Sequence, residues 1–409
     1  EIGLPPGDGP FPIYLRTAAY SRFSHSGYHN RATAEYGELI HGKPLKWGFV
    51  AINFRGIAES EGETVLHNTL DDPNGQQIRD ALDTVLWVKK QPWCNGVIIM
   101  GGNSGNGVGP TQVKLANAPV TYTQPGNSAA DYPHGWGYVN GVRRGLMDWF
   151  KSQNGKTGGP IPKFPVPTIA KNYNPERMLA ELKKYAASQK NIVVCHVRNG
   201  WYDLTFEDAL CVFEAYAPQG NMFATIGPNS HGGPPQGPVK WPDSKSNPEF
   251  RWTKEYAREL LLGKKLPVRK SQLMYYVFGD ARDESAPGNE YRVTHVWPVR
   301  STPMCLYLHD DGVMRPEPSE EDAATLGYTY NPKDPIKTHG GANYAPLESE
   351  AACYDQRDLA YRKDILRFAS RPLEKPLETD VEGIYLCGGS TGPIDISESV
   401  VQACAASMK

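Results

Sequence analysis

The chain has 409 residues and a formal net charge of −2, and its basic residues do not cluster, which argues against nucleic acid as the main partner. No apolar run approaches the length of a membrane span, so no membrane partner is expected. The chain is longer than one hydrophobic core usually spans, so we expect two or three domains in a loop-rich globular protein.

The seven cysteines are scattered and form no C-x-x-C pair, so we expect neither a metal site nor another cofactor. Because the sequence begins at Glu1 without methionine, we expect a preceding segment that would have carried any targeting signal. A periplasmic or secreted location is favoured over a cytoplasmic one.

The first part of the chain has the pattern of a parallel α/β sheet. Buried strands are expected at 11–16, 48–54 and 96–101, and apolar residues on one face predict a helix over 75–91. A strand, a helix and a strand in close succession are typical of a parallel α/β unit.

The alternation of strands and helices is interrupted at residues 126–189. This segment is rich in glycine and aromatic residues and includes a predicted helix at 175–188. Insertions in an open α/β sheet lie at its ligand cleft, so this segment is expected to form a cap. Strands at 191–197 and 222–227, with a helix at 206–217 between them, then resume the sheet.

Short alternating runs punctuated by proline and glycine follow and predict an all-β domain. The expected fold class is therefore α/β, an open sheet with an inserted cap and a C-terminal β domain. The predicted divisions are 1–125 and 190–272 for the core, 126–189 for the cap, and 273–409 for the β domain.

The stretch "VIIMGGNSGNGVGP" carries a glycine-rich loop after a predicted strand. A phosphate-binding P-loop is excluded because no lysine stands directly after the last glycine, and G-x-G-x-x-G fails because position 110 is proline. A serine nucleophile on a strained turn needs small neighbours, and Ser104 has them, although the usual G-x-S-x-G is imperfectly matched. The alternative is an ordinary glycine-rich turn between strand and helix.

A serine nucleophile needs a base and an acid that orients the base, and each should follow a later strand. Asp203 follows the strand at 191–197, and His231 follows the strand at 222–227, in the required order. Asp203 is otherwise interpreted as a turn or capping residue, and His231 as a solvated loop residue.

Several blocks of the sequence resemble the cocaine esterase and X-prolyl dipeptidyl peptidase family of serine hydrolases. "GPFPIYLRTAAYSR" is similar to a segment that ends in R-T-P-Y, and "FVAINFRGIAESEGE" resembles D-x-R-G-x-x-x-S-E-G. "LWVKKQPWCNGVIIMGGNSGNG" resembles the nucleophile region, and "NGWYD" and "IGPNSHGG" resemble the acid and histidine motifs. "YTYNPKDPIKTHGG" and "DQRDLAYRKDILRFASRPLE" are similar to stretches of the family's β domain.

The resemblance implies an α/β-hydrolase core, a helical cap and a jelly-roll-like β-sandwich, here incomplete. It also implies residue roles: Ser104 as nucleophile, His231 as general base and Asp203 as its orienting carboxylate. The Tyr20 hydroxyl and the Gly105 backbone N–H would stabilise the oxyanion.

The chain also departs from the family pattern at three positions and at its ends. Gly105 replaces a tyrosine, Asn53 an aspartate and Asn229 a tryptophan, and both ends are shorter than the family's. Only a backbone donor is needed at Gly105, so the chemistry survives that change while the pocket wall differs.

The substrate is expected to be a small ester or amide, cleaved without a metal, and homo-oligomers are possible. For four aromatic residues of the cap, a substrate-pocket role is weighed against a structural role in the core of the cap: Trp136, Tyr138, Trp149 and Phe150. Trp201 is also assigned to the substrate pocket. The alternatives to an esterase or acylase are an X-prolyl dipeptidyl peptidase and a non-catalytic descendant that binds a partner or a glycan through its β domain.

Overall fold

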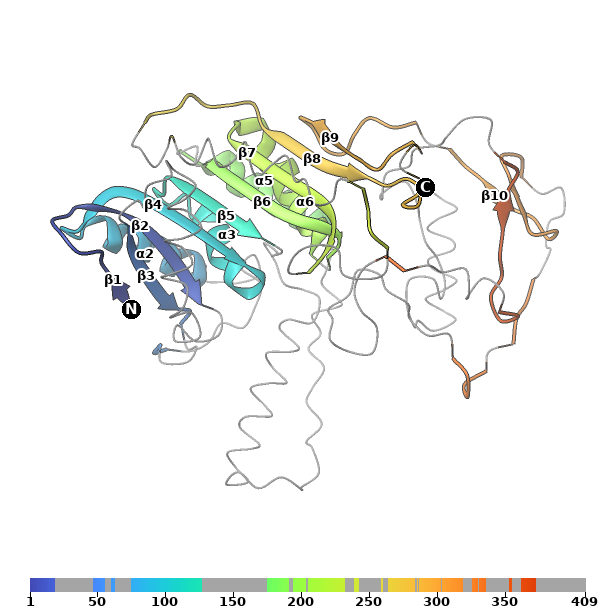
Figure 1. The fold of residues 1–409 in the computed structure, drawn as a ribbon, viewed down its shortest axis with the longest axis horizontal. Helices are drawn as coiled ribbons and strands as arrows, with labels where there is room; N and C mark the ends of the chain where they lie inside the picture. Colours follow the sequence, from blue (N-terminus) through green and yellow to red (C-terminus); the bar gives the residue numbers. More distant parts are fainter. Residues whose placement is uncertain are drawn as a thin grey trace, which may run out of the picture.

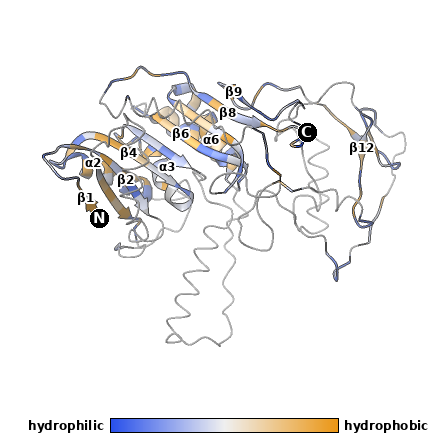
Figure 2. Cartoon of the chain, in the orientation of Figure 1, coloured by the Kyte–Doolittle hydropathy of each residue, from blue (hydrophilic) through white to orange (hydrophobic). Residues whose placement is uncertain are grey.

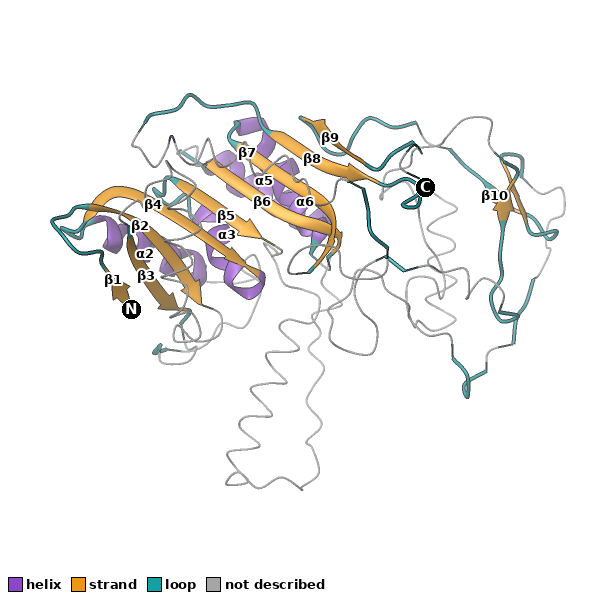
Figure 3. Cartoon of the chain, viewed as in Figure 1, coloured by secondary structure: helices purple, strands orange, loops and turns teal. Residues whose placement is uncertain are grey.

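A nine-stranded sheet dominates the structure, a computed structural model (Figures 1 and 3). The strand order is β1-β3-β2-β4-β5-β6-β7-β8-β9; the strands from β2 to β8 run parallel, and β1 and β9 are antiparallel edge strands. The residues that the structure describes are 1–18, 47–55, 60–62, 75–126, 175–190, 194–203, 205–231, 239–242, 259, 264–283, 285, 287–302, 304–318, 326–329, 331–335, 353–354 and 362–372.

The strands predicted in the core are present, and most extend further toward their carboxyl ends than the sequence indicated. The strands of the large sheet are β1 (Ile2–Gly3), β2 (Phe11–Ala18), β3 (Gly48–Asn53), β4 (Cys94–Asn103), β5 (Tyr122–Gly126), β6 (Val194–Tyr202), β7 (Met222–Ser230), β8 (Gln272–Val277) and β9 (Glu290–Thr294).

In the described part of the chain, four α-helices pack on one face of this sheet. They are α2 (Gln76–Lys89), α3 (Val108–Leu115), α5 (Pro175–Ser188) and α6 (Phe206–Tyr216). Alternate residues of β2 and β4 face α2, and alternate residues of β6 and β7 face α5 and α6, in two apolar clusters. Figure 2 shows the hydrophobic residues gathered on the central strands and α6. This burial is what the period-2 and period-3.6 patterns of the sequence predict.

The opposite face of the sheet forms a smaller aromatic-rich cluster. Tyr14 stacks on Phe49 with ring centroids 6.1 Å apart, and Tyr122 packs beside them. Both faces of the parallel strands therefore carry buried apolar residues, as expected for a sheet of this type.

Helix α5 belongs to the layer that covers the sheet, although the sequence analysis put it in the cap. Met178 and Leu182 lie in the same cluster as Phe213 of α6, and Leu182 has no exposed surface. The rest of the predicted cap, 127–174, lies outside the described residues.

The large sheet also continues past the boundary predicted at 272/273. Strand β8 pairs with β7, and β9 pairs with β8, so both belong to the core sheet rather than to a separate β domain. Beyond them the described residues include a three-stranded sheet of β10 (Tyr307–Leu308), β11 (Val313–Arg315) and β12 (Ala369–Ser370). The jelly-roll-like domain remains an expectation.

Helix α3 approaches the sheet closely at Gly109. A Cβ atom there would come 1.7 Å from Thr17 Oγ1 and 2.8 Å from Met100 Cε. We therefore expect Gly109→Ala to lower the free energy of unfolding by about 1–3 kcal/mol, measured by urea denaturation. In the control, Gly327→Ala, the new Cβ meets nothing within 4 Å. Equal stability of the two variants would contradict this close packing.

Candidate active site

Ser104 lies on a sharp turn between β4 and helix α3. Its φ of 56° is in the left-handed region, which is strained for a residue with a side chain. A single 3₁₀ turn, Ser104–Gly107, connects the strand to α3. The small residues that follow Ser104 allow this turn, as the sequence predicted, and the Ser104 side chain stands at the carboxyl edge of the sheet.

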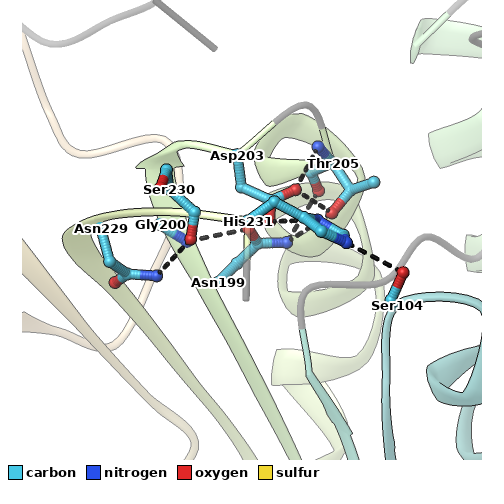
Figure 4. A network of polar contacts seen from close by, with 8 residues as sticks. All are labelled: Ser104, Asn199, Gly200, Asp203, Thr205, Asn229, Ser230 and His231. Carbon is cyan, nitrogen blue, oxygen red and sulfur yellow. Dashed lines mark hydrogen bonds and ion pairs between the residues drawn. The ribbon is translucent and has the colours of Figure 1, made fainter. Parts of the chain in front are cut away.

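Three segments that are far apart in the sequence bring Ser104, His231 and Asp203 together. His231 Nε2 lies 2.8 Å from Ser104 Oγ, and His231 Nδ1 lies 2.8 Å from Asp203 Oδ2. Figure 4 shows the His231 ring between the two partners. β4, β6 and β7 are parallel, so their carboxyl ends share one edge of the sheet.

The environment of Asp203 determines its charge. Its side chain has no exposed surface, whereas that of His231 is 14% exposed. Burial is the largest effect on the Asp203 carboxyl and raises its pKa, but the hydrogen bond and charge of His231 and two hydrogen bonds from Thr205 outweigh it. The pKa of Asp203 therefore lies below its ordinary value, and the group is ionised at neutral pH.

The charge of Asp203 decides the direction of its hydrogen bond with His231. An ionised carboxylate only accepts, so His231 Nδ1 donates to Asp203. With the ring neutral, its other nitrogen, Nε2, is left to accept a hydrogen bond from the Ser104 hydroxyl. A hydroxyl held in this way by an imidazole and a carboxylate is able to lose its proton and act as a nucleophile.

Two residues that the sequence analysis did not single out support Asp203. The backbone N–H and the hydroxyl of Thr205 bind Asp203 Oδ1 at 2.8 and 2.7 Å. Asn199 Nδ2 in turn lies 2.9 Å from Thr205 Oγ1 and 3.0 Å from its carbonyl oxygen. A threonine at the start of a predicted helix was the available signal, but it is typical of ordinary capping.

The other predicted site residues divide into two groups. Gly105 is buried in the 3₁₀ turn directly after Ser104. Tyr20 and four of the aromatic residues lie outside the described residues: Trp136, Tyr138, Trp149 and Phe150.

Trp201 is described, and its environment is that of the core. Its ring packs against Phe206 and Trp297, its Nε1 donates to the carbonyl oxygen of Tyr276 at 2.7 Å, and it is 9% exposed. On strand β6 the Trp201 side chain points to the helix-covered face, which is why the structure puts it in the core rather than in a pocket.

Asn229, where relatives were expected to have tryptophan, is half-buried, and its Nδ2 donates to the Ser230 carbonyl oxygen at 3.1 Å. Within the described ranges, no group of three His, Cys, Asp or Glu side chains has the geometry of a metal site. None of the helices in those ranges is long and apolar enough to cross a membrane.

Comparisons with known proteins agree with this fold. The sequence model of the X-Pro dipeptidyl-peptidase (S15) family matches residues 1–156. An α-amino acid ester hydrolase is similar in structure, with a TM-score of 0.60 and 19% identity over 91% of this chain and 70% of that one. An aminopeptidase from the marine sediment archaeon Thaumarchaeota archaeon has a TM-score of 0.57 and 18% identity over the same shares. At these identities the likeness concerns the fold.

A match in sequence also links the chain to cocaine esterase of Rhodococcus sp. (strain MB1 Bresler). It is 32% identical over 116 residues, which are 28% of this chain and 18% of that enzyme. The matched segment therefore spans less than a fifth of the relative. Together with the S15 match and the fold, it makes the chain similar to the hydrolases that include the X-Pro dipeptidyl-peptidases and cocaine esterase.

Proposed function

We propose that the chain is a serine hydrolase that cleaves a small ester or amide through an acyl-enzyme intermediate. One observation carries the proposal: the continuous hydrogen-bonded series from Ser104 Oγ through the His231 ring to the buried Asp203 carboxylate. The strained φ of Ser104 supports it, because backbone strain of this kind gathers at reactive sites.

In the proposed mechanism His231 Nε2 takes the Ser104 proton as Oγ attacks the substrate carbonyl carbon. The Asp203 carboxylate stabilises the imidazolium that forms. The oxyanion accepts hydrogen bonds from the Gly105 N–H and the Tyr20 hydroxyl, and His231 then protonates the leaving group. A water molecule, deprotonated by His231, attacks the acyl-enzyme and releases the acid.

Cleavage of X-prolyl peptides is the second candidate, because the S15 family match covers the segment that contains Ser104. It uses the same three side chains but needs an acceptor for a peptide N-terminus. An assay that compares the hydrolysis of aryl esters with that of proline-containing dipeptide anilides distinguishes the two candidate functions. We favour the simple ester or amide, since residues 105–110 contain no acid that would bind an ammonium group next to the nucleophile.

We expect Ser104→Ala to reduce kcat on an aryl ester by about 10⁴-fold or more, since the reaction loses its nucleophile. Labelling by a fluorophosphonate should disappear, while the melting temperature stays near that of the wild type. Ser188→Ala is the matched control, because Ser188 is an exposed serine at the end of α5 that donates only to a backbone carbonyl. Full labelling of Ser104→Ala would refute the assignment of the nucleophile.

The proposed role of Asp203 requires the folded protein to favour its anion. A pKa below the ordinary value of 3.8 contributes stability that is complete above the unfolded pKa and is lost as pH falls toward the folded one. We therefore expect the free energy of unfolding to decline more steeply for the wild type than for Asp203→Asn between about pH 5 and pH 3. Urea denaturation at a series of pH values measures this, and parallel curves would contradict it.

We expect Tyr20→Phe to lower kcat on an aryl ester by about 10²–10³-fold, because one donor to the oxyanion is lost. KM and the free energy of unfolding should change little. Near-normal kcat with reduced stability would mean instead that Tyr20 only packs, and that the second donor is another group.

A further inference from the structure

The direction of each hydrogen bond around Thr205 follows from the number of hydrogens that each group carries. Thr205 Oγ1 carries one hydrogen and lies between Asp203 Oδ1 at 2.7 Å and Asn199 Nδ2 at 2.9 Å. Since the ionised Asp203 only accepts, the hydroxyl hydrogen must point to Asp203. The hydroxyl oxygen then accepts one hydrogen of Asn199 Nδ2.

Asn199 is itself held in one orientation. Its Nδ2 donates its second hydrogen to the Thr205 carbonyl oxygen at 3.0 Å, and its Oδ1 accepts the Gly200 N–H at 2.8 Å. A flipped amide would oppose acceptor to acceptor and donor to donor at these two contacts. Asn199 and Thr205 are 3% and 2% exposed, so water does not replace these bonds readily.

The usual structural role of such a threonine is absent here. Thr205 is the N-cap residue of α6, a position where a threonine side chain normally accepts a hydrogen bond from the first turn. Its side chain makes no capping hydrogen bond and binds the Asp203 carboxylate instead. The Thr205 hydroxyl therefore supports Asp203 rather than the end of the helix.

We infer that Thr205 and Asn199 are positioning residues for the hydrolytic reaction, an inference that rests on the proposed function. Asn199 fixes the Thr205 hydroxyl, which together with the Thr205 N–H holds Asp203 Oδ1. The other carboxylate oxygen, Oδ2, is thereby kept toward His231 Nδ1, so the ring presents Nε2 to Ser104 (Figure 4). Neither residue touches the reacting atoms.

The test compares Thr205→Val, which keeps the shape and loses the hydroxyl, with Thr205→Ser, which keeps the hydroxyl. With p-nitrophenyl acetate, we expect Thr205→Val to lower kcat about tenfold to hundredfold at constant KM, since a small displacement of a catalytic group has effects of this size. Thr205→Ser should restore most of the rate. The fraction of molecules that a fluorophosphonate finally labels should stay at the wild-type level, while the labelling rate falls with kcat.

Thr225→Val is the matched control. Thr225 is a buried threonine of β7, 4% exposed, whose hydroxyl lies 3.3 Å from His196 on the other face of the sheet. Its loss removes a buried hydroxyl as well, and should lower stability without lowering kcat. An equal loss of kcat in Thr205→Val and Thr225→Val would overturn the inference, as would a kcat for Thr205→Val within about twofold of the wild type.

Asn199→Ala provides a second test, and its effect in the wild-type background does not depend on the folding of Thr205→Val. We expect it to lower kcat several-fold in the wild-type background and to have little further effect in Thr205→Val, because Asn199 acts through the Thr205 hydroxyl. If the two substitutions lowered kcat independently, so that their effects multiplied in the double variant, the inference that Asn199 acts through Thr205 would be overturned. A wild type that neither hydrolyses the ester nor labels would overturn the proposed function itself; an active wild type with an unaffected Thr205→Val overturns this inference alone.

Discussion

The buried charge of Asp203 is the constraint around which the site is organised. A carboxylate without exposed surface is strongly unfavourable unless hydrogen bonds and an opposite charge compensate it. Here the compensation comes from His231 at the end of β7 and from Thr205 at the start of α6. The positive end of the α6 dipole adds to it. The end of β6, the start of α6 and the end of β7 must therefore meet at one point.

The parallel sheet brings these three segments together and also places Ser104, at the end of β4, beside them. The carboxyl ends of β4, β6 and β7 lie at the same edge, so Ser104 reaches the far side of the His231 ring. Ser104 has a left-handed backbone, and α3, which follows it, packs tightly on β2 and β4 at Gly109.

Much of this arrangement was predictable because it depends on patterns that sequence carries well. Apolar runs marked the strands, and a polar residue just after each of three strands marked Ser104, Asp203 and His231. The interaction of Asn199 with Thr205 was not predictable, since a single buried asparagine in a strand has no periodic signal. Trp201 was assigned to the pocket because the predicted strand ended at residue 197, whereas β6 continues to Tyr202 and Trp201 packs in the core. Strands β8 and β9 were assigned to a second domain because edge strands of a mixed sheet and strands of a β-sandwich share the same short alternating pattern.

The central claim is that catalysis passes through a covalent ester on Ser104, and one measurement tests it directly. The protein is mixed with a slowly deacylated aryl ester, quenched in acid during turnover, and examined by intact-mass and peptide-mapping mass spectrometry. The account predicts a mass increase equal to one acyl group, located on the peptide that contains Ser104. Turnover without an adduct, or an adduct on another residue, would contradict it.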